Sequence, residues 1–229
     1  MSVVFRETGV PAIAAEYVRE QIRQGQIAPG ERIVERAIAD QLGISSIAVR
    51  DAFARLTLEG WIERIPRRGV RVRTLDVDEI VDISSLRALL EGEAAARAAT
   101  QIANAASLSP VSVAALELIS SIPAAMARAG KRGDRQALLT LDDAFHAALW
   151  HLSGSPTLEE VLQNLRARIT PMIRESVHLI ARNELVEMSN WHAELLAALN
   201  EGPEPARLAA AHHTNRTKQR VLEHSRAER

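Results

Sequence analysis

The sequence predicts a mainly α-helical protein with two domains: an N-terminal winged helix-turn-helix with a small β-wing, at residues 8–74, and a C-terminal all-α antiparallel helical bundle, at residues 78–226. Three observations predict this fold class. Apolar residues recur at helical spacing in several separate segments. One pair of β-rich runs flanks a turn that contains Pro66 and Gly69. Beyond residue 78, the segments all have helical patterns.

The N-terminal domain is predicted to follow the order helix, helix, turn, helix, β-wing. Its helices are expected around residues 14–22, 35–42 and 46–59, and its wing at 61–65 and 70–73. Gly25 and Gly60 end the first and third helices. Ser45 is expected to cap the third helix, because its hydroxyl can accept a hydrogen bond from a free N–H group of the first turn.

The C-terminal domain is predicted to consist of helices alone. The helical segments are 78–105, 111–129, 134–152, 156–180, 188–200 and 204–226. The breaks between them are rich in glycine, serine and proline, which favour turns. No period repeats among the segments, so we expect a bundle and not a solenoid.

Composition limits the class of protein. An apolar fraction of 47% and a charged fraction of 25% are typical of a soluble globular protein. We find no apolar run that approaches the roughly 20 residues of a membrane span and no secretory signal, so we predict a cytoplasmic protein without a membrane partner. Because the chain has no cysteine, disulfides and thiolate metal sites are excluded.

Charge is distributed unevenly along the chain. Residues 1–74 contain twelve arginines against nine acidic residues, whereas the whole chain has a formal charge of −1. The N-terminal part therefore carries +3 and the remainder −4. This asymmetry weakly favours a polyanion as the partner of the N-terminal domain.

The third helix has the two faces of a DNA-recognition helix. One face is apolar and must point into the core; it comprises Val49, Ala52, Phe53 and Leu56. The opposite face exposes small residues around Arg50, which suits a major groove about 12 Å wide. The predicted DNA contacts are Arg36, Ser45, Ser46, Ile47, Arg50 and the wing tip Arg67, Arg68 and Gly69. The alternative is that Arg50 is solvated or paired with a neighbouring carboxylate, and that Arg67 and Arg68 belong to an ordinary polar turn.

The bundle contains a possible metal site. Asp142 and His146 are four residues apart on one helix, so their side chains project from the same face. Two later histidines, His192 and His213, could join them, and such ligands suit Zn²⁺, Ni²⁺, Mn²⁺ or Fe²⁺ better than Ca²⁺. Taken alone, an Asp–His pair at this spacing is commonplace, and a surface ion pair or a core histidine is the more usual explanation for it.

The N-terminal domain resembles the DNA-binding domain of GntR-type transcriptional regulators. The resemblance lies in the segments Gly25–Glu35, Ile38–Ser45, Val49–Leu56 and Glu59–Ile62. It implies a double-stranded DNA operator as partner, with contacts from Arg36, Arg50 and the wing around Gly69. Many family members have arginine at the position of Ser46, so the operator sequence or affinity is expected to differ here.

The helical domain resembles the FCD ligand-binding domain of the FadR subfamily. Leu86–Ala95, Leu141–Leu149, Leu152–Pro156 and the stretch from His192 to His213 carry the resemblance. It implies one divalent metal ion per chain, bound by Asp142, His146, His192 and His213. The adjacent His212 leaves the last ligand open, and the alignment favours His213. Arg87 is expected either to bind a small carboxylate metabolite or to form an ion pair with Glu91.

We therefore predict a homodimeric transcriptional regulator, with repression favoured over activation, whose operator binding is controlled by a small organic acid. Two alternatives assign the helical domain a different role. The helical domain could serve dimerisation alone, without a ligand. The four candidate ligands could instead belong to a metal-dependent hydrolase, but the sequence has no further base or nucleophile motif and catalysis would not account for residues 1–74. We predict that the protein is not an enzyme.

Overall fold

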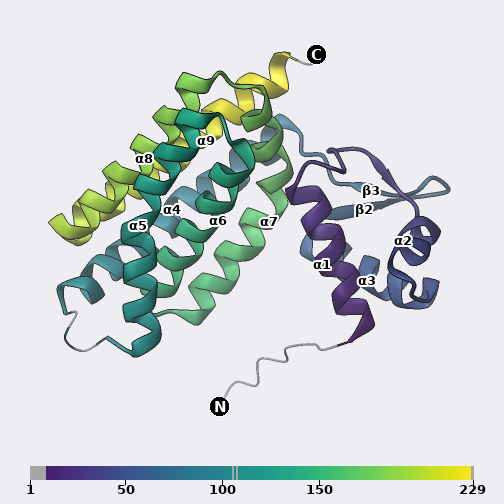
Figure 1. Cartoon of the computed structure of the whole chain (residues 1–229), viewed down its shortest axis with the longest axis horizontal. Coiled ribbons are helices and arrows are strands. Elements are labelled where there is room, and N and C mark those ends of the chain that lie inside the picture. The colour runs from purple at the N-terminus through teal and green to yellow at the C-terminus, as the bar shows by residue number, and fades with distance from the viewer. Residues whose placement is uncertain (1–8, 105, 107, 228–229) are drawn as a thin grey trace. The chain divides into compact units, whose positions relative to one another are not determined.

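The computed structural model describes residues 9–104, 106 and 108–227, which form two compact units whose main parts lie before and after Thr74 (Figure 1). The fold class agrees with the prediction: a winged helix-turn-helix is followed by an antiparallel helical bundle. Residue 8, the predicted start of the first domain, and residue 105, a predicted helix end, lie outside the described residues.

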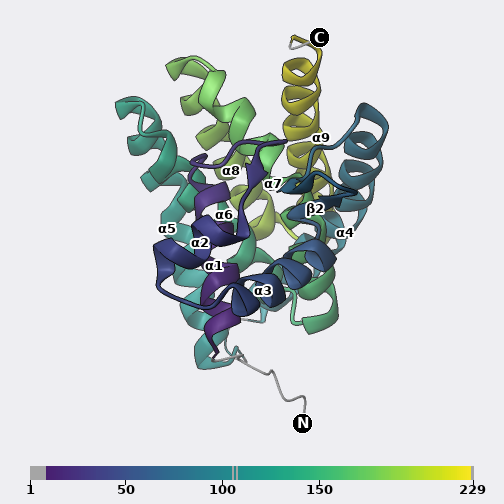
Figure 2. The same cartoon turned by 90° about the vertical axis from the view of Figure 1, so that its right-hand side faces the viewer.

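The first unit combines helices with a three-stranded antiparallel sheet (Figures 1 and 2). Its elements are α1 (Val10–Arg23), β1 (Arg32–Ile33), α2 (Glu35–Leu42), α3 (Ser46–Glu59), β2 (Ile62–Ile65) and β3 (Gly69–Val72). The strand order is β1-β3-β2, and Ile65 pairs with Gly69 to close the wing hairpin. Strand β1 was not predicted, because a strand of two residues is too short to show a period.

Local signals fix the turn between α2 and α3. Gly43 ends α2 with a φ of +65°, in the left-handed region that glycine adopts without a steric penalty. The Ser45 hydroxyl accepts a hydrogen bond from the Ala48 N–H at 3.2 Å, which confirms the predicted cap. The predicted inner face of α3 is buried as well, and Phe53 is completely covered. The core of this unit therefore positions the opposite face of α3.

In the described part of the chain, six long helices lie side by side in the second unit (Figure 1). They are α4 (Val77–Ala103), α5 (Pro110–Arg132), α6 (Arg135–Leu152), α7 (Pro156–Leu179), α8 (Arg182–Glu201) and α9 (Pro203–Ala227). One predicted boundary was wrong: α8 begins at Arg182 and not at residue 188. The Glu184 carboxylate accepts a hydrogen bond from the Ala181 N–H at 2.9 Å, which stabilises this earlier start.

Helix α5 is long and apolar enough to cross a membrane by length and composition alone. The expectation that no run approaches this length was therefore wrong. In the structure α5 packs against α6 and α8, and its Ile122 and Met126 belong to the buried core. At Gly130 an added Cβ would lie 3.0 Å from the Leu185 carbonyl oxygen, so α5 and α8 are in close contact. Helix α5 is a bundle helix.

Candidate functional site

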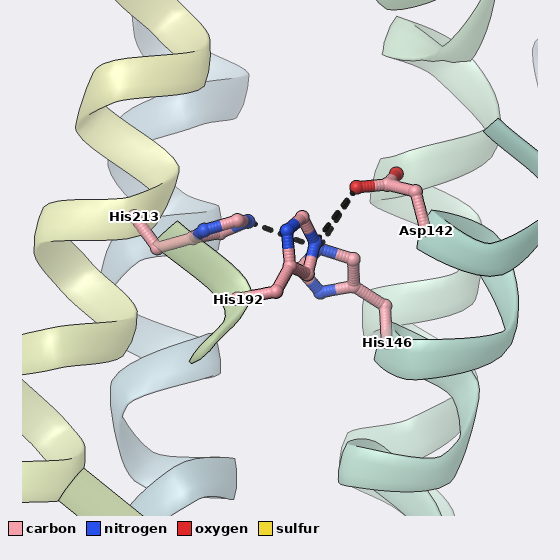
Figure 3. A group of neighbouring side chains, drawn as sticks. All are labelled: Asp142, His146, His192 and His213. Carbon is pink, nitrogen blue, oxygen red and sulfur yellow. Dashed lines mark hydrogen bonds and ion pairs between the residues drawn. The ribbon is translucent and has the colours of Figure 1, made fainter. Parts of the chain in front are cut away.

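Four predicted metal ligands come together inside the second unit (Figure 3). Asp142 and His146 project from α6, His192 from α8 and His213 from α9. All four side chains are buried, and their candidate ligand atoms lie within 4.8 Å of one another. Positions 71 residues apart in the sequence thus form one cluster of three imidazoles and one carboxylate.

The distances within this cluster suit a common central ion. His192 Nε2 lies 2.9 Å from Asp142 Oδ1, and His146 Nε2 lies 3.2 Å from His213 Nε2. Ligand bonds of 2.0–2.1 Å in a tetrahedral site give ligand-to-ligand separations of about 3.3 Å. His192 Nδ1 contacts the Met188 carbonyl oxygen at 2.8 Å; because a carbonyl only accepts, Nδ1 donates and Nε2 keeps its lone pair.

The structure distinguishes the two adjacent histidines of α9. His213 is 4% exposed and lies in the cluster, whereas His212 is exposed. Successive helical residues point about 100° apart, so both cannot face the same site. Ala206 and Ala210, which are completely buried, set which face of α9 is turned inward. The geometry therefore agrees with the choice of His213.

A second layer, which the sequence analysis did not assign to the metal site, supports His146. Glu91 Oε2 on α4 lies 3.2 Å from His146 Nδ1, and Glu91 Oε1 accepts a hydrogen bond from Arg87 at 2.5 Å. Glu91 is completely buried and Arg87 is 2% exposed. A carboxylate at Nδ1 leaves Nε2 as the ligand atom and fixes the orientation of the ring. Of the two expectations for Arg87, the ion pair with Glu91 is present.

Asp142 also has a buried partner that sequence spacing could not reveal. The guanidinium of Arg166, on α7, contacts Asp142 Oδ2 and also contacts Asp143 Oδ1 at 2.8 Å. This leaves Asp142 Oδ1 directed toward His192. Arg166 therefore positions the carboxylate so that one oxygen faces the imidazoles.

Electrostatics keep Asp142, His146 and His213 in the protonation states that a metal ion requires. Burial opposes ionisation of Asp142, but the Arg166 guanidinium holds the pKa of Asp142 well below its usual range. Burial, together with the neighbouring His192 and His146, holds the pKa of His213 well below its usual value. Burial also lowers the pKa of His146, although Glu91 acts in the opposite direction. The carboxylate is thus charged and these imidazoles are neutral near pH 7.

These shifts predict that the metal-free protein loses stability in mild acid. Below about pH 6.5 the histidines of the unfolded chain take up protons, whereas His146 and His213 in the folded chain, whose pKa values are lowered, take up fewer. The unfolded state then binds more protons, so the unfolding free energy should fall between pH 6.5 and 5.5, by at most about 1 kcal/mol per histidine. Urea denaturation of chelator-treated protein at both pH values measures this. A stability that is equal or higher at pH 5.5 would contradict the assignment, and His213→Asn should reduce the dependence.

The predicted DNA contacts in the helices lie on the surface of the first unit. Ser46, Ile47 and Arg50 are exposed on α3, and Ile47 is 70% exposed. Arg50 Nε lies 3.4 Å from a carboxylate oxygen of Glu35, at the start of α2. Arg36 is highly exposed and lies 3.8 Å from Asp40. These residues are therefore available to a partner at one end of α3.

The wing tip is a tight turn with an unusual backbone. The Arg68 N–H donates to the Ile65 carbonyl at 3.0 Å across Pro66 and Arg67. Arg67 has a φ of +63°, in the region where glycine or asparagine is normally preferred. Gly69 follows with a φ of +92°. The predicted wing residues therefore form one exposed tip.

Comparisons with known proteins give the same division of the chain. Residues 12–72 match the family described as bacterial regulatory proteins, gntR family, and residues 82–216 match the FCD domain. The chain is 29% identical over 184 residues to the HTH-type transcriptional regulator McbR of Escherichia coli K12, covering 80% of this chain and 78% of McbR. It is 27% identical over 207 residues to a "Probable D-xylose utilization operon transcriptional repressor" of Paenarthrobacter nicotinovorans, covering 90% and 86% of the two chains.

Solved structures share the fold. The structure of E. coli McbR/YncC superposes with a TM-score of 0.81 at 24% identity, covering 95% of this chain and 99% of that one. At this identity the likeness concerns the fold alone.

Proposed function

Because the chain belongs to the gntR family of bacterial regulatory proteins and carries an FCD domain, we propose that it is an operator-binding repressor controlled by a small organic acid bound beside a metal ion. The family matches and the relatives show a DNA-binding transcriptional regulator and not an enzyme. The hydrolase alternative is therefore wrong. The single observation that carries the finer proposal is the buried cluster of Asp142, His146, His192 and His213.

The four residues fit a divalent transition metal. Three imidazoles and one carboxylate are ligands of intermediate hardness, which suit Zn²⁺, Ni²⁺, Mn²⁺ or Fe²⁺. Glu91 would orient His146, and Arg166 would hold Asp142 with one oxygen directed inward. When bound, one ion per chain would supply a Lewis-acidic anchor for an oxygen ligand.

The balance of buried charge favours an anionic effector. Two buried arginines and two buried carboxylates lie in or beside the cluster, so their formal charges cancel; they are Arg87, Arg166, Glu91 and Asp142. The half-buried Asp143, which also contacts Arg166, adds one negative charge beside them. A divalent cation would add two positive charges to a buried site, where unpaired charge is costly. A small carboxylate metabolite would offset this charge. Arg87 is proposed to act on the effector through Glu91 and His146, since its guanidinium already binds Glu91.

Regulation would require a dimer of two copies of the chain. We propose a cytoplasmic homodimer of the FadR subfamily that reads two half-sites of a pseudo-palindromic operator, with one α3 in each major groove. The effector would bind the dimer more tightly in one arrangement of its two DNA-binding domains than in the other, and would therefore favour that arrangement. Repression is favoured because the Paenarthrobacter relative is named a repressor.

Replacing Arg50 with alanine tests the DNA-binding surface. Loss of one bidentate contact to a base should weaken operator binding by about 1–3 kcal/mol, or roughly 5- to 150-fold. A gel shift with the promoters of its own and neighbouring genes measures this. Arg55→Ala is the control, because Arg55 lies later on α3 and binds Glu59 at 2.7 Å. Equal binding by both variants and the unchanged protein would remove Arg50 from the interface.

Thermal denaturation with a panel of small organic acids tests the effector. A ligand of the native state present at 100 times its Kd should add about 2.7 kcal/mol of stability. The metal-loaded protein should respond to at least one acid, and the chelator-treated protein should respond less. If no acid raises the melting temperature, the helical domain serves dimerisation alone.

A further inference from the structure

Beside the wing, the first unit contains a hollow of about 380 Å³. It is lined by Gly30, Arg32, Ile65, Arg67, Arg68, Val70 and Arg71. Four of these seven residues are arginines, and they come from β1, β3 and the tip of the hairpin. Arg32 and Arg71 were not among the DNA contacts predicted from the sequence. We call this feature the arginine hollow.

The arginines of the hollow differ from other arginines of the same unit. Arg19 and Arg55 bind Glu59, and Arg23 binds Glu16, each at 2.7 Å. Within the described residues, no carboxylate lies within ion-pair distance of Arg32, Arg67 or Arg68, and of the four arginines in the hollow only Arg71 has one, Glu63 at 2.7 Å. Among the residues that the structure describes, positive charge is therefore left uncompensated at Arg32, Arg67 and Arg68.

The backbone brings these charges together at a cost in stability. Arg32 and Arg71 are directly opposite each other in the antiparallel pairing of β1 with β3, and like charges in this position destabilise a sheet. A Cβ on Gly69 would lie 3.5 Å from Arg32 Nε, so the guanidinium lies against the Gly69 backbone. The left-handed conformation of Arg67 costs about 1–2 kcal/mol. The facing like charges and the left-handed Arg67 both oppose folding. A bound anion would offset the repulsion between the charges.

We propose that the arginine hollow is a phosphate-binding site, and that its ligand is a phosphodiester of the DNA that flanks the base pairs contacted by α3. This inference rests on the proposed DNA-binding function and extends the interface beyond the wing tip. Guanidinium groups match phosphate oxygens through paired, charge-assisted hydrogen bonds. The hollow is continuous with Arg67 and Arg68 at the tip, so a backbone that passes the tip can reach Arg32. A free phosphate ion shares this chemistry and is the competing source.

The salt dependence of DNA binding tests the site. Each phosphate contact adds about 0.9 to the slope of log K against log salt concentration. Arg32→Gln should lower this slope by about 1 and weaken binding to operator and unrelated DNA by the same factor. Arg32→Lys keeps the charge and should retain the slope. Arg55→Gln removes the same charge at a neutralised site and should leave the slope unchanged.

The outcomes separate the hollow from the rest of the interface. An Arg32→Gln protein that melts like the unchanged protein and retains its slope overturns the proposal. So does a phosphate-induced rise in melting temperature, at constant ionic strength, that needs Arg32 while the slope stays unchanged, because the ligand is then free phosphate. If the unchanged protein binds neither DNA, the proposed function itself fails.

Discussion

Replacing Glu91 with leucine should lower the unfolding free energy of the metal-free protein by about 3–5 kcal/mol, the range expected when one partner of a buried ion pair is removed. The reason is that Arg87 would keep its charge while it is 2% exposed and without its carboxylate. Urea denaturation followed by circular dichroism measures the change. Glu93→Leu is the matched control on the same helix. Glu93 is partly exposed and pairs with Arg97 and Arg207, so its loss should cost about 1 kcal/mol or less.

The double variant Arg87→Met, Glu91→Leu separates stability from metal binding. Removing both charges avoids an unpaired buried ion, so most of the lost stability should return. Metal affinity should nevertheless remain about 10- to 100-fold weaker than in the unchanged protein, because His146 Nδ1 has lost its carboxylate. A competition titration with a coloured chelator measures that affinity. A Glu91→Leu protein within 0.5 kcal/mol of the unchanged protein would show that Arg87 finds another partner or reaches solvent.

His213→Ala should remove the bound metal, whereas His212→Ala should retain about one ion per chain. The two residues are adjacent in sequence, but only His213 lies in the cluster. Loss of one of four ligands leaves three donors and breaks the connection between α9 and the site. Elemental analysis of protein purified without chelator or affinity tag gives the stoichiometry.

His146→Ala should behave like His213→Ala in the same measurement, because both supply an Nε2 to the cluster. Loss of metal in His212→Ala together with retention in His213→Ala would reverse the assignment on α9. Retention in both His146→Ala and His213→Ala would place the ion elsewhere in the protein.

Sequence pattern predicted most of the fold because long amphipathic helices and glycine stops are local signals. The inner face of α3 and the cap at Ser45 follow from spacing and side-chain chemistry alone. Two features could not be obtained in this way. Strand β1 exists only through its pairing with β3, which is a tertiary contact. The first turn of α8 is polar apart from Leu185, so it has too little periodicity to predict its start.

The cluster itself was predicted through a family resemblance, since an Asp–His pair four residues apart is common in helices. The residues that surround it were harder to find. From the sequence, Glu91 was predicted only as an ion-pair partner of Arg87, which lies four residues earlier on α4. Its contact with His146 depends on how α4 packs against α6. Arg166 lies on α7 and Asp142 on α6, so no spacing along a single helix could predict their contact. The arginine hollow likewise depends on the register of two strands.

The packing of α4 against α9 makes the site depend on a helix that is synthesised late. These are the first and last helices of the second unit, and they supply Glu91 and His213 to opposite sides of His146. Because chains are synthesised from the N-terminus, a nascent chain that has emerged only as far as α8 holds Asp142, His146 and His192 without the fourth ligand. Tight metal capture should therefore begin only after α9 has left the ribosome and docked, so an ion would bind chains that contain α9 more tightly than chains truncated before it.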